Sequence, residues 1–174
     1  MEAVKAADPH RDAKTSVTES FRVTKTDSGL ISAFRVLGRA YAEELMPLLP
    51  SSERDRFLQS ILAKQEEPDR WLLLLKHEMR YSGFAHFKID KDERIGWGFI
   101  LEYYIITSKR RMGLGTKFFS LIARMLQTKR VEDVWLLTDS SDAESFWRSI
   151  GFRFAGELDR ETGQKILKAK LTAR

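Results

Sequence analysis

The stretch from residue 97 to residue 137 limits the chain to folds in which helices pack on a β-sheet. Residues 97–106 form a long apolar run typical of a strand, and residues 113–127 carry apolar side chains at helical spacing. Residues 133–137 return as a short, mainly apolar segment, as expected of a buried strand. This pattern predicts a β-α-β unit and therefore the α/β fold class.

The segments on either side extend this unit to one domain. We expect the order β-αα-βββ-α-β-α-ββ, which gives a mixed, mostly antiparallel sheet flanked by helices. Residues 1–19 are expected to form a flexible N-terminal tail and residues 20–174 a single domain, because no linker or repeat interrupts them. Predicted strands are residues 21–24, 71–76, 83–89, 97–106, 133–137, 152–157 and 165–171; predicted helices begin at Asp27 or Ser28, at Ser51 or Ser52, at Gly113, and at Ser141 with Glu144 completing a capping box.

The composition excludes several kinds of function. The chain has no cysteine, which rules out disulfides, thiolate metal ligands and a covalent acyl-cysteine intermediate. Its three histidines, His10, His77 and His86, do not have a metal-ligand spacing, so we expect no metal site. No segment has the length and apolarity of a membrane span or a secretory signal, and we expect a cytoplasmic protein.

The net charge of +5 suits a nucleic acid, a phosphate-rich cofactor or a basic surface that only contacts solvent. Lysines and arginines are spread along the chain, and no DNA-binding or RNA-binding motif is present. The sequence therefore disfavours a nucleic-acid partner. It leaves open whether the chain forms a homodimer.

The loop between the long strand and the following helix is suited to phosphate. A helix N-terminus offers free backbone N–H groups and a positive dipole end, and glycine lets a phosphate approach the backbone closely. A loop whose turn alone requires glycine is the other interpretation. The spacing matches neither a Walker A loop nor the three-glycine dinucleotide motif. The loop reads Arg110-Arg111-Met112-Gly113-Leu114-Gly115-Thr116.

A second motif follows the predicted buried strand. Residues 140–152 read Ser-Ser-Asp-Ala-Glu-Ser-Phe-Trp-Arg-Ser-Ile-Gly-Phe. Together with Arg-x-x-Gly-x-Gly in the loop, this stretch resembles the GNAT superfamily of N-acetyltransferases, over residues 21–171. The family places its loop after a bulged fourth strand and often continues with Asn-x-x-Ala-x-x-Phe-Tyr-x-x-x-Gly-Phe. The resemblance implies a GNAT fold and transfer of acetyl from acetyl-CoA to a primary amine, on a small molecule or a protein, in a ternary complex.

The resemblance also implies which residues bind acetyl-CoA. Ile105 is expected at the bulge, with its backbone facing the pantetheine amides, and the loop is expected around the pyrophosphate. Ser140 takes the place of the usual asparagine and keeps a shorter hydrogen-bonding group. The expected cofactor contacts are Ile105, Arg110, Arg111, Met112, Gly113, Leu114, Gly115, Thr116 and Ser140.

Two positions bear on the chemical step. A lysine-like amine with a pKa of about 10.4 is almost fully protonated at pH 7, so acetyl transfer benefits from a base. Glu102 lies in the apolar strand, where burial would make a carboxylate a stronger base; an outward-facing glutamate paired with a lysine is the equal alternative. Trp147 stands where many family members have the tyrosine thought to protonate the leaving thiolate, and an indole is no practical acid.

Substrate contacts are expected on two elements. Glu43 and Glu44 end the first predicted helix, where GNAT enzymes commonly admit substrate, and they would attract an ammonium group, although charges at a helix end are often only solvated. Tyr103 and Tyr104 face opposite sides of their strand, and we expect Tyr103 to contact the substrate. His86 could face the same site, but a core or surface histidine is commoner.

Two other functions remain open from the sequence. A GNAT-fold protein that has lost catalysis would serve as an acyl-CoA-binding sensor or scaffold, which the tryptophan at position 147 favours. Outside the family, a basic nucleic-acid-binding module is the alternative. The identity of the amine acceptor is not encoded in any recognisable motif.

Overall fold

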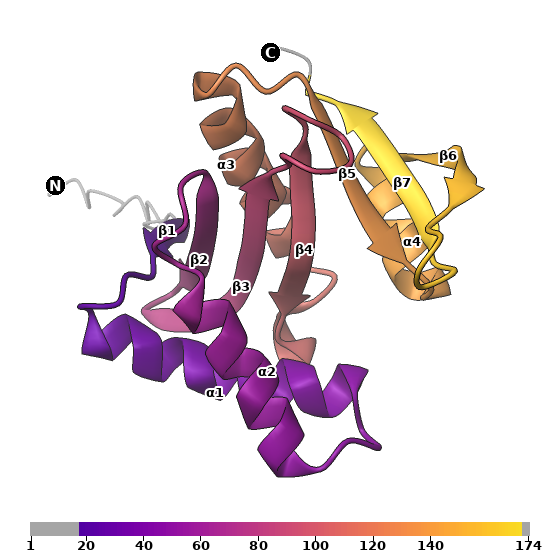
Figure 1. Cartoon of the computed structure of the whole chain (residues 1–174). Coiled ribbons are helices and arrows are strands. Elements are labelled where there is room, and N and C mark those ends of the chain that lie inside the picture. Colours follow the sequence, from indigo (N-terminus) through magenta and orange to yellow (C-terminus); the bar gives the residue numbers. More distant parts are fainter. Residues whose placement is uncertain (1–17, 172–174) are drawn as a thin grey trace, which may run out of the picture.

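A seven-stranded sheet forms the centre of the computed structural model, which describes residues 18–171 (Figure 1). Its strand order is β1-β2-β3-β4-β5-β7-β6, and β4 with β5 is the parallel pair. The predicted element order and mixed sheet are confirmed, with a short 3-10 helix added. The elements are β1 (Thr18–Arg22), α1 (Ser28–Leu45), α2 (Ser51–Ala63), β2 (Arg70–His77), β3 (Arg80–Ile89), β4 (Gly98–Ile105), η1 (Thr107–Lys109), α3 (Leu114–Thr128), β5 (Asp133–Thr138), α4 (Ser141–Ser149), β6 (Arg153–Leu158) and β7 (Lys165–Lys170).

The first strand differs in its bounds from the sequence prediction. Thr18 and Glu19 already pair with β2, so β1 covers residues 18–22 rather than 21–24. Backbone pairing does not require apolar side chains, and the apolar pattern therefore missed Thr18, Glu19 and Ser20. The rest of the expected N-terminal tail lies outside the described residues.

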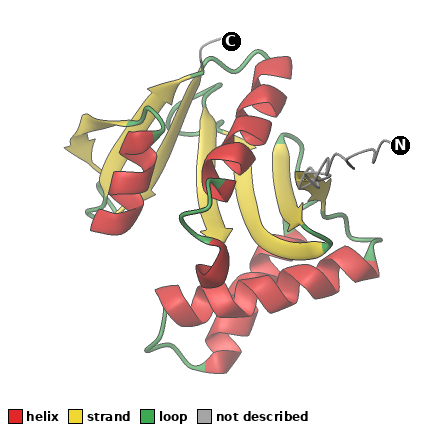
Figure 2. Ribbon diagram, turned by 180° about the vertical axis from the view of Figure 1, so that it is seen from behind, coloured by secondary structure: helices red, strands yellow, loops and turns green. Residues whose placement is uncertain are grey.

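Helices cover both faces of the sheet, which explains why β2 is buried almost throughout. Helices α3 and α4 pack on the face seen in front in Figure 2, and α1 and α2 pack on the other. Because side chains alternate along a strand, Leu73 and Leu75 join the core under α3, while Leu72 and Leu74 join the core under α1 and α2.

Side-chain caps fix where two helices begin. Asp27 accepts a hydrogen bond from the Leu30 backbone N–H at 2.9 Å, which confirms the predicted start of α1. At α4 the cap is Ser140, whose Oγ accepts from the Ala143 N–H at 3.3 Å. The predicted capping box from Ser141 is therefore wrong by one residue, since two adjacent serines give the same sequence signal.

The central strands β4 and β5 separate after a short parallel contact. They pair only where residues 98–100 meet residues 134–136. Beyond this point β4 runs on to Ile105, while β5 continues beside β7 to Thr138, and the two strands diverge in Figure 1. Strand β4 leads through η1 into the loop that starts α3.

A β-bulge in β4 sets which side chains face which helices. His86 and Phe87 are consecutive on β3 but pair with Glu102 and Ile100, which leaves Leu101 as the extra residue. The bulge thus lies at Leu101 and not, as expected, at Ile105. The apolar sequence of this strand gives no signal for the position of the bulge, because a bulge depends on how two strands pair.

The bulge also shifts the alternation along β4. Ile100, Tyr103 and Ile105 all join the core under α3 and α4, whereas Tyr104 joins the core under α1 and α2. Glu102 is therefore presented on the α1 side, next to its cross-strand partner His86.

Candidate active site

The loop before α3 has the backbone of an anion site. Arg111 and Gly113 have left-handed backbone, with φ of 60° and 75°, and no side chain caps the helix start. The first-turn N–H groups of Leu114, Gly115 and Thr116 have no helical carbonyl to bond, and no acidic residue lies in that turn. Arg111 and Thr116 are exposed. The predicted phosphate loop is thus an open turn with free donors.

Gly115 is required for packing, in addition to any role in ligand binding. A Cβ at this position would lie 3.0 Å from the ring of Phe146 on α4. The Gly115 carbonyl accepts a hydrogen bond of 2.5 Å from the Tyr103 hydroxyl. The absence of a side chain therefore lets the start of α3 lie against both β4 and α4.

The side chain of Arg110 turns away from the α3 turn and ties β4 to α1. Its Nη1 and Nη2 donate to the two carboxylate oxygens of Glu44 at 2.8 and 2.7 Å, and its Nε donates to the Ile105 carbonyl at 2.8 Å. The guanidinium lies 5.4 Å from the centroid of the Tyr104 ring. The structure thus brings together Arg110 and Glu44, which were assigned separately to cofactor and substrate, whereas Glu43 forms no ion pair with another residue of the range 18–171.

An aromatic cluster fills the space between β4, α3 and α4. Trp147 is 5% exposed and contacts the rings of Tyr103, Phe119, Phe146 and Phe152, with centroids 4.9 to 5.6 Å away. Burial raises the pKa of the Tyr103 hydroxyl well above its usual range. Tyr103, expected as a substrate contact, thus lies within this cluster.

Glu102 is held on the opposite face by a histidine. Its Oε2 is hydrogen-bonded to His86 Nδ1, and its side chain is 13% exposed. His86 Nε2 lies 3.0 Å from Arg70 Nη1, and Arg70 Nε donates to Glu67 at 2.7 Å. The alternative of an outward-facing glutamate paired with a lysine is therefore wrong.

Sequence reasoning missed one residue beside this carboxylate. Tyr41 on α1 was placed only in an apolar stripe, but its hydroxyl is close enough to Glu102 and Glu44 for their charges to matter. Burial first, and then these two carboxylates, raise the pKa of Tyr41 above its usual range. The signal that could have located it is its position one turn before Glu44 on the same helix.

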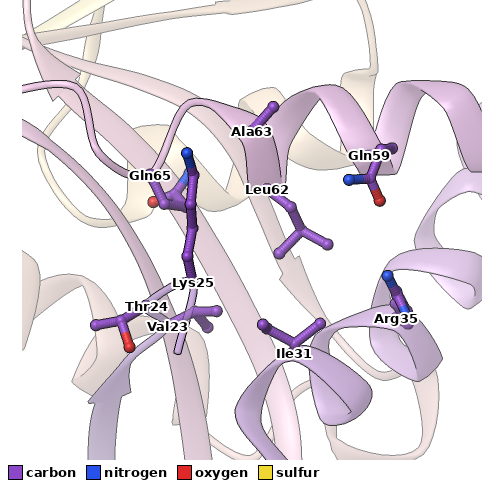
Figure 3. Close-up of a pocket in the computed structure, with 9 residues that line it drawn as sticks. All are labelled: Val23, Thr24, Lys25, Ile31, Arg35, Gln59, Leu62, Ala63 and Gln65. Atoms are coloured by element: carbon purple, nitrogen blue, oxygen red, sulfur yellow. The ribbon is translucent and has the colours of Figure 1, made fainter. Parts of the chain in front are cut away.

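Two hollows of the surface lie away from these residues. One of about 210 Å³ opens between α1, α2 and the segment after β1 (Figure 3), and another of about 240 Å³ lies beside Arg70 and Lys88. Neither includes the α3 loop or Glu102. The residues of the first hollow are Val23, Thr24, Lys25, Ile31, Arg35, Gln59, Leu62, Ala63 and Gln65.

Two further searches concern the described residues only. Within residues 18–171, no three or more histidine and carboxylate side chains gather closely enough to hold a metal ion. None of the helices in this range is both long and apolar enough to cross a membrane.

The comparisons with known proteins agree on the fold. PaiA N-acetyltransferase from Thermoplasma acidophilum, in complex with coenzyme A, is 14% identical, with 88% of this chain and 99% of that chain covered and a TM-score of 0.68. An aminoglycoside 6′-N-acetyltransferase complexed with coenzyme A is 11% identical, with 90% and 98% covered and a TM-score of 0.69. An acetyltransferase from Thermus thermophilus is 21% identical, with 88% and 96% covered and a TM-score of 0.67.

No curated protein matches the chain significantly in sequence. A family model described as the acetyltransferase (GNAT) family matches residues 35–152, more than half of the chain. The chain therefore belongs to the GNAT family of acetyltransferases.

Proposed function

We propose that the protein is an acetyl-CoA-dependent N-acetyltransferase that acetylates a primary amine by direct attack in a ternary complex. The observation that carries this proposal is the open first turn of α3, with its left-handed Gly113, next to the end of β4, which has separated there from β5. Its support includes the fact that two of the similar structures are complexes with coenzyme A. The substrates are acetyl-CoA and an amine.

The cofactor contacts follow the backbone of the loop. The N–H groups of residues 111–116 would bind the pyrophosphate, and Arg111 would add positive charge. Ile105, at the end of β4 where β5 has diverged, would offer its backbone to the pantetheine. Arg110 and Ser140 remain proposed contacts through their backbones, because Glu44 and the Ala143 N–H engage their side chains.

In the chemical step, the ammonium form of the amine first loses one proton and becomes a nucleophile. Its nitrogen then bonds to the acetyl carbon, the carbon–sulfur bond breaks, and the second N–H proton passes to the leaving thiolate or to solvent. At pH 7 an amine with a pKa of about 10.4 is neutral in roughly one molecule in 2,500, a deficit of about 4–5 kcal/mol. Glu102 would take the first of these protons, that of the ammonium, on Oε1, since His86 occupies Oε2. The thiolate leaves as a modest base, with a pKa of roughly 8.5 for an ordinary thiol, so the enzyme can work without an acid at Trp147.

The acceptor is proposed to enter at the end of α1. Glu43 is exposed and forms no ion pair with another residue of the range 18–171. Glu44 neutralises Arg110, and the charges of Glu102 and Glu44 both contribute to the raised pKa of Tyr41. This arrangement favours a cationic amine over a neutral one. Tyr103 is buried in the aromatic cluster, so its proposed effect on the substrate is indirect: the cluster would shape the wall of the site.

Thiol release tests the proposal. The purified protein with acetyl-CoA and a panel of primary amines should release CoA faster with at least one amine than with none. Stabilisation by acetyl-CoA without amine-dependent release would instead indicate an acyl-CoA-binding sensor or scaffold, which the buried Trp147 at the tyrosine position would then explain. Absence of both effects would contradict the proposed function.

A further inference from the structure

A row of hydrogen-bonded side chains crosses three strands on the α1 side of the sheet. It runs from Glu102 on β4 to His86 on β3, then to Arg70 on β2 and to Glu67 before β2. His86 is 4% exposed and the Arg70 side chain 11% exposed, whereas Glu67 is half exposed. The row therefore connects the proposed base to the surface through two buried groups.

The contact with Arg70 determines which ring nitrogen of His86 carries the proton. A guanidinium has five N–H donors and no acceptor, and it stays protonated in proteins. In the contact of 3.0 Å with Arg70, His86 Nε2 must therefore accept. A neutral imidazole with an accepting Nε2 carries its proton on Nδ1, the atom that contacts Glu102 Oε2. His86 thus donates to the carboxylate.

The other groups around the pair do not disturb this arrangement. Glu67 compensates the charge of Arg70 at 2.7 Å, and Tyr41 stays protonated because burial and the nearby carboxylates raise its pKa. A second proton on His86 would break the bond from Arg70 and place two cations in contact. The buried charges are therefore the carboxylate of Glu102 and the guanidinium of Arg70, separated by a neutral ring.

We propose that Arg70 and His86 are positioning residues for Glu102. Arg70 holds His86 in the Nδ1–H form, and His86 in turn holds Oε2, so that Oε1 of the carboxylate has a fixed direction toward the acceptor amine. The inference rests on the proposed role of Glu102 as base. It adds that the base depends on two residues that do not touch the substrate.

The tautomer is measured without any activity assay. In protein labelled with ¹⁵N-histidine, long-range ¹H–¹⁵N spectra distinguish Nδ1–H, Nε2–H and imidazolium forms, and the His86→Gln variant assigns the signal. We expect Nδ1–H at pH 7 in the wild type. Arg70→Met should convert the ring to the Nε2–H or imidazolium form, whereas Lys88→Met, which removes a nearby cation that does not touch His86, should not. An Nε2–H or imidazolium ring in the wild type would overturn the proposal.

A double-mutant cycle tests the catalytic consequence. We expect His86→Leu to lower kcat by about tenfold to a hundredfold with the KM for acetyl-CoA unchanged, and to have no further effect in a Glu102→Gln background. His86→Gln, whose amide can both donate and accept, should recover kcat to within about fivefold of the wild type. Each variant is first shown to fold by circular dichroism and thermal unfolding.

Equal losses of kcat in both backgrounds would mean that His86 acts only on the fold, and would overturn the proposal. A folded His86→Leu protein with wild-type kcat would do the same. Failure of the wild type to acetylate any amine would contradict the proposed function. This outcome is distinguishable from a failure of the present inference, because the tautomer measurement would still show whether Arg70 and His86 are hydrogen-bonded to Glu102 as described.

Discussion

Trp147 is a core residue at a position where the family often has a catalytic tyrosine. Its indole contacts four aromatic rings and is 5% exposed, so its surroundings are those of a packing residue. We expect Trp147→Phe to lower the free energy of unfolding by about 1–3 kcal/mol, because a smaller ring leaves unfilled volume. Turnover should stay within about tenfold.

Denaturant unfolding and single-turnover kinetics on the same preparation separate these effects. Trp135→Phe, a buried tryptophan in contact with Phe99, is a matched control for lost aromatic volume. A fall in turnover beyond a hundredfold in Trp147→Phe alone would show that the indole takes part in the chemical step.

Glu102 gives a pH-dependent prediction at the same scale. Glu102→Gln should lower the acetylation rate by about a hundredfold or more near pH 7, because the free amine is scarce and the amide accepts no proton. The loss should shrink at pH 9 and above, where solution supplies the neutral amine. Parallel pH–rate profiles of wild type and variant, with the same acid limb, would remove Glu102 from the mechanism.

The start of α3 is the element on which cofactor binding depends. Gly113 has a φ of 75°, which valine rarely adopts, and a Cβ there would meet no atom within 4 Å. Gly163, in the turn between β6 and β7, has a φ of 72° and equally open space. Valine at either position should lower the Tm by a few degrees through backbone strain.

Only Gly113→Val should also abolish the rise in Tm with acetyl-CoA, because only that side chain would stand at the phosphate turn. Thermal unfolding of both variants, with and without millimolar acetyl-CoA, makes the comparison. An undiminished acetyl-CoA effect in Gly113→Val would place the phosphates elsewhere.

The turn between β3 and β4 depends on one buried carboxylate. Although burial opposes ionisation, the backbone N–H groups of Arg94 and Asp92 and the cation of Lys88 lower the pKa of Asp90 below its ordinary value of 3.8. Its bonds to those N–H groups are 2.8 and 3.2 Å long. Because the folded-state pKa is depressed, this stabilisation is fully present above the ordinary value and is lost as the pH falls through the folded value.

Asp90→Asn should therefore lower the free energy of unfolding by about 1–3 kcal/mol at pH 7, and by progressively less below about pH 4. Urea unfolding from pH 7 to pH 3 measures the difference. Asp92→Asn removes an exposed carboxylate from the same turn and should have a much smaller effect. A constant difference between Asp90→Asn and wild type at all pH values would contradict this explanation.

At the scale of the whole molecule, the sequence predicted those features of the fold that depend on residues close together in the chain. The order of helices and strands, the Asp27 cap and the turn before α3 follow from neighbouring residues, and the structure confirms them. The predicted strand ends differ from the observed ones by at most three residues, since backbone pairing decides them. The bulge at Leu101 was misplaced for the same reason.

The side-chain partners of the candidate site depend on contacts between distant segments. Glu44 and Arg110 are 66 residues apart, and His86 meets Glu102 only because β3 and β4 pair in this register. A single sequence carries no signal for such contacts unless the register is known. The residue types of the site could therefore be identified in advance, but their pairing could not.

Thermal unfolding of the wild-type protein with acetyl-CoA tests the central claim most directly. At a concentration of about a hundred times Kd, the ligand should add about 2.7 kcal/mol of stability, which corresponds to a rise in Tm of roughly 5–10 °C for a domain of this size. Coenzyme A should give a similar rise, and pantetheine, which lacks the pyrophosphate, a much smaller one. An unchanged Tm at millimolar acetyl-CoA would contradict the proposal that the α3 turn binds an acyl-CoA.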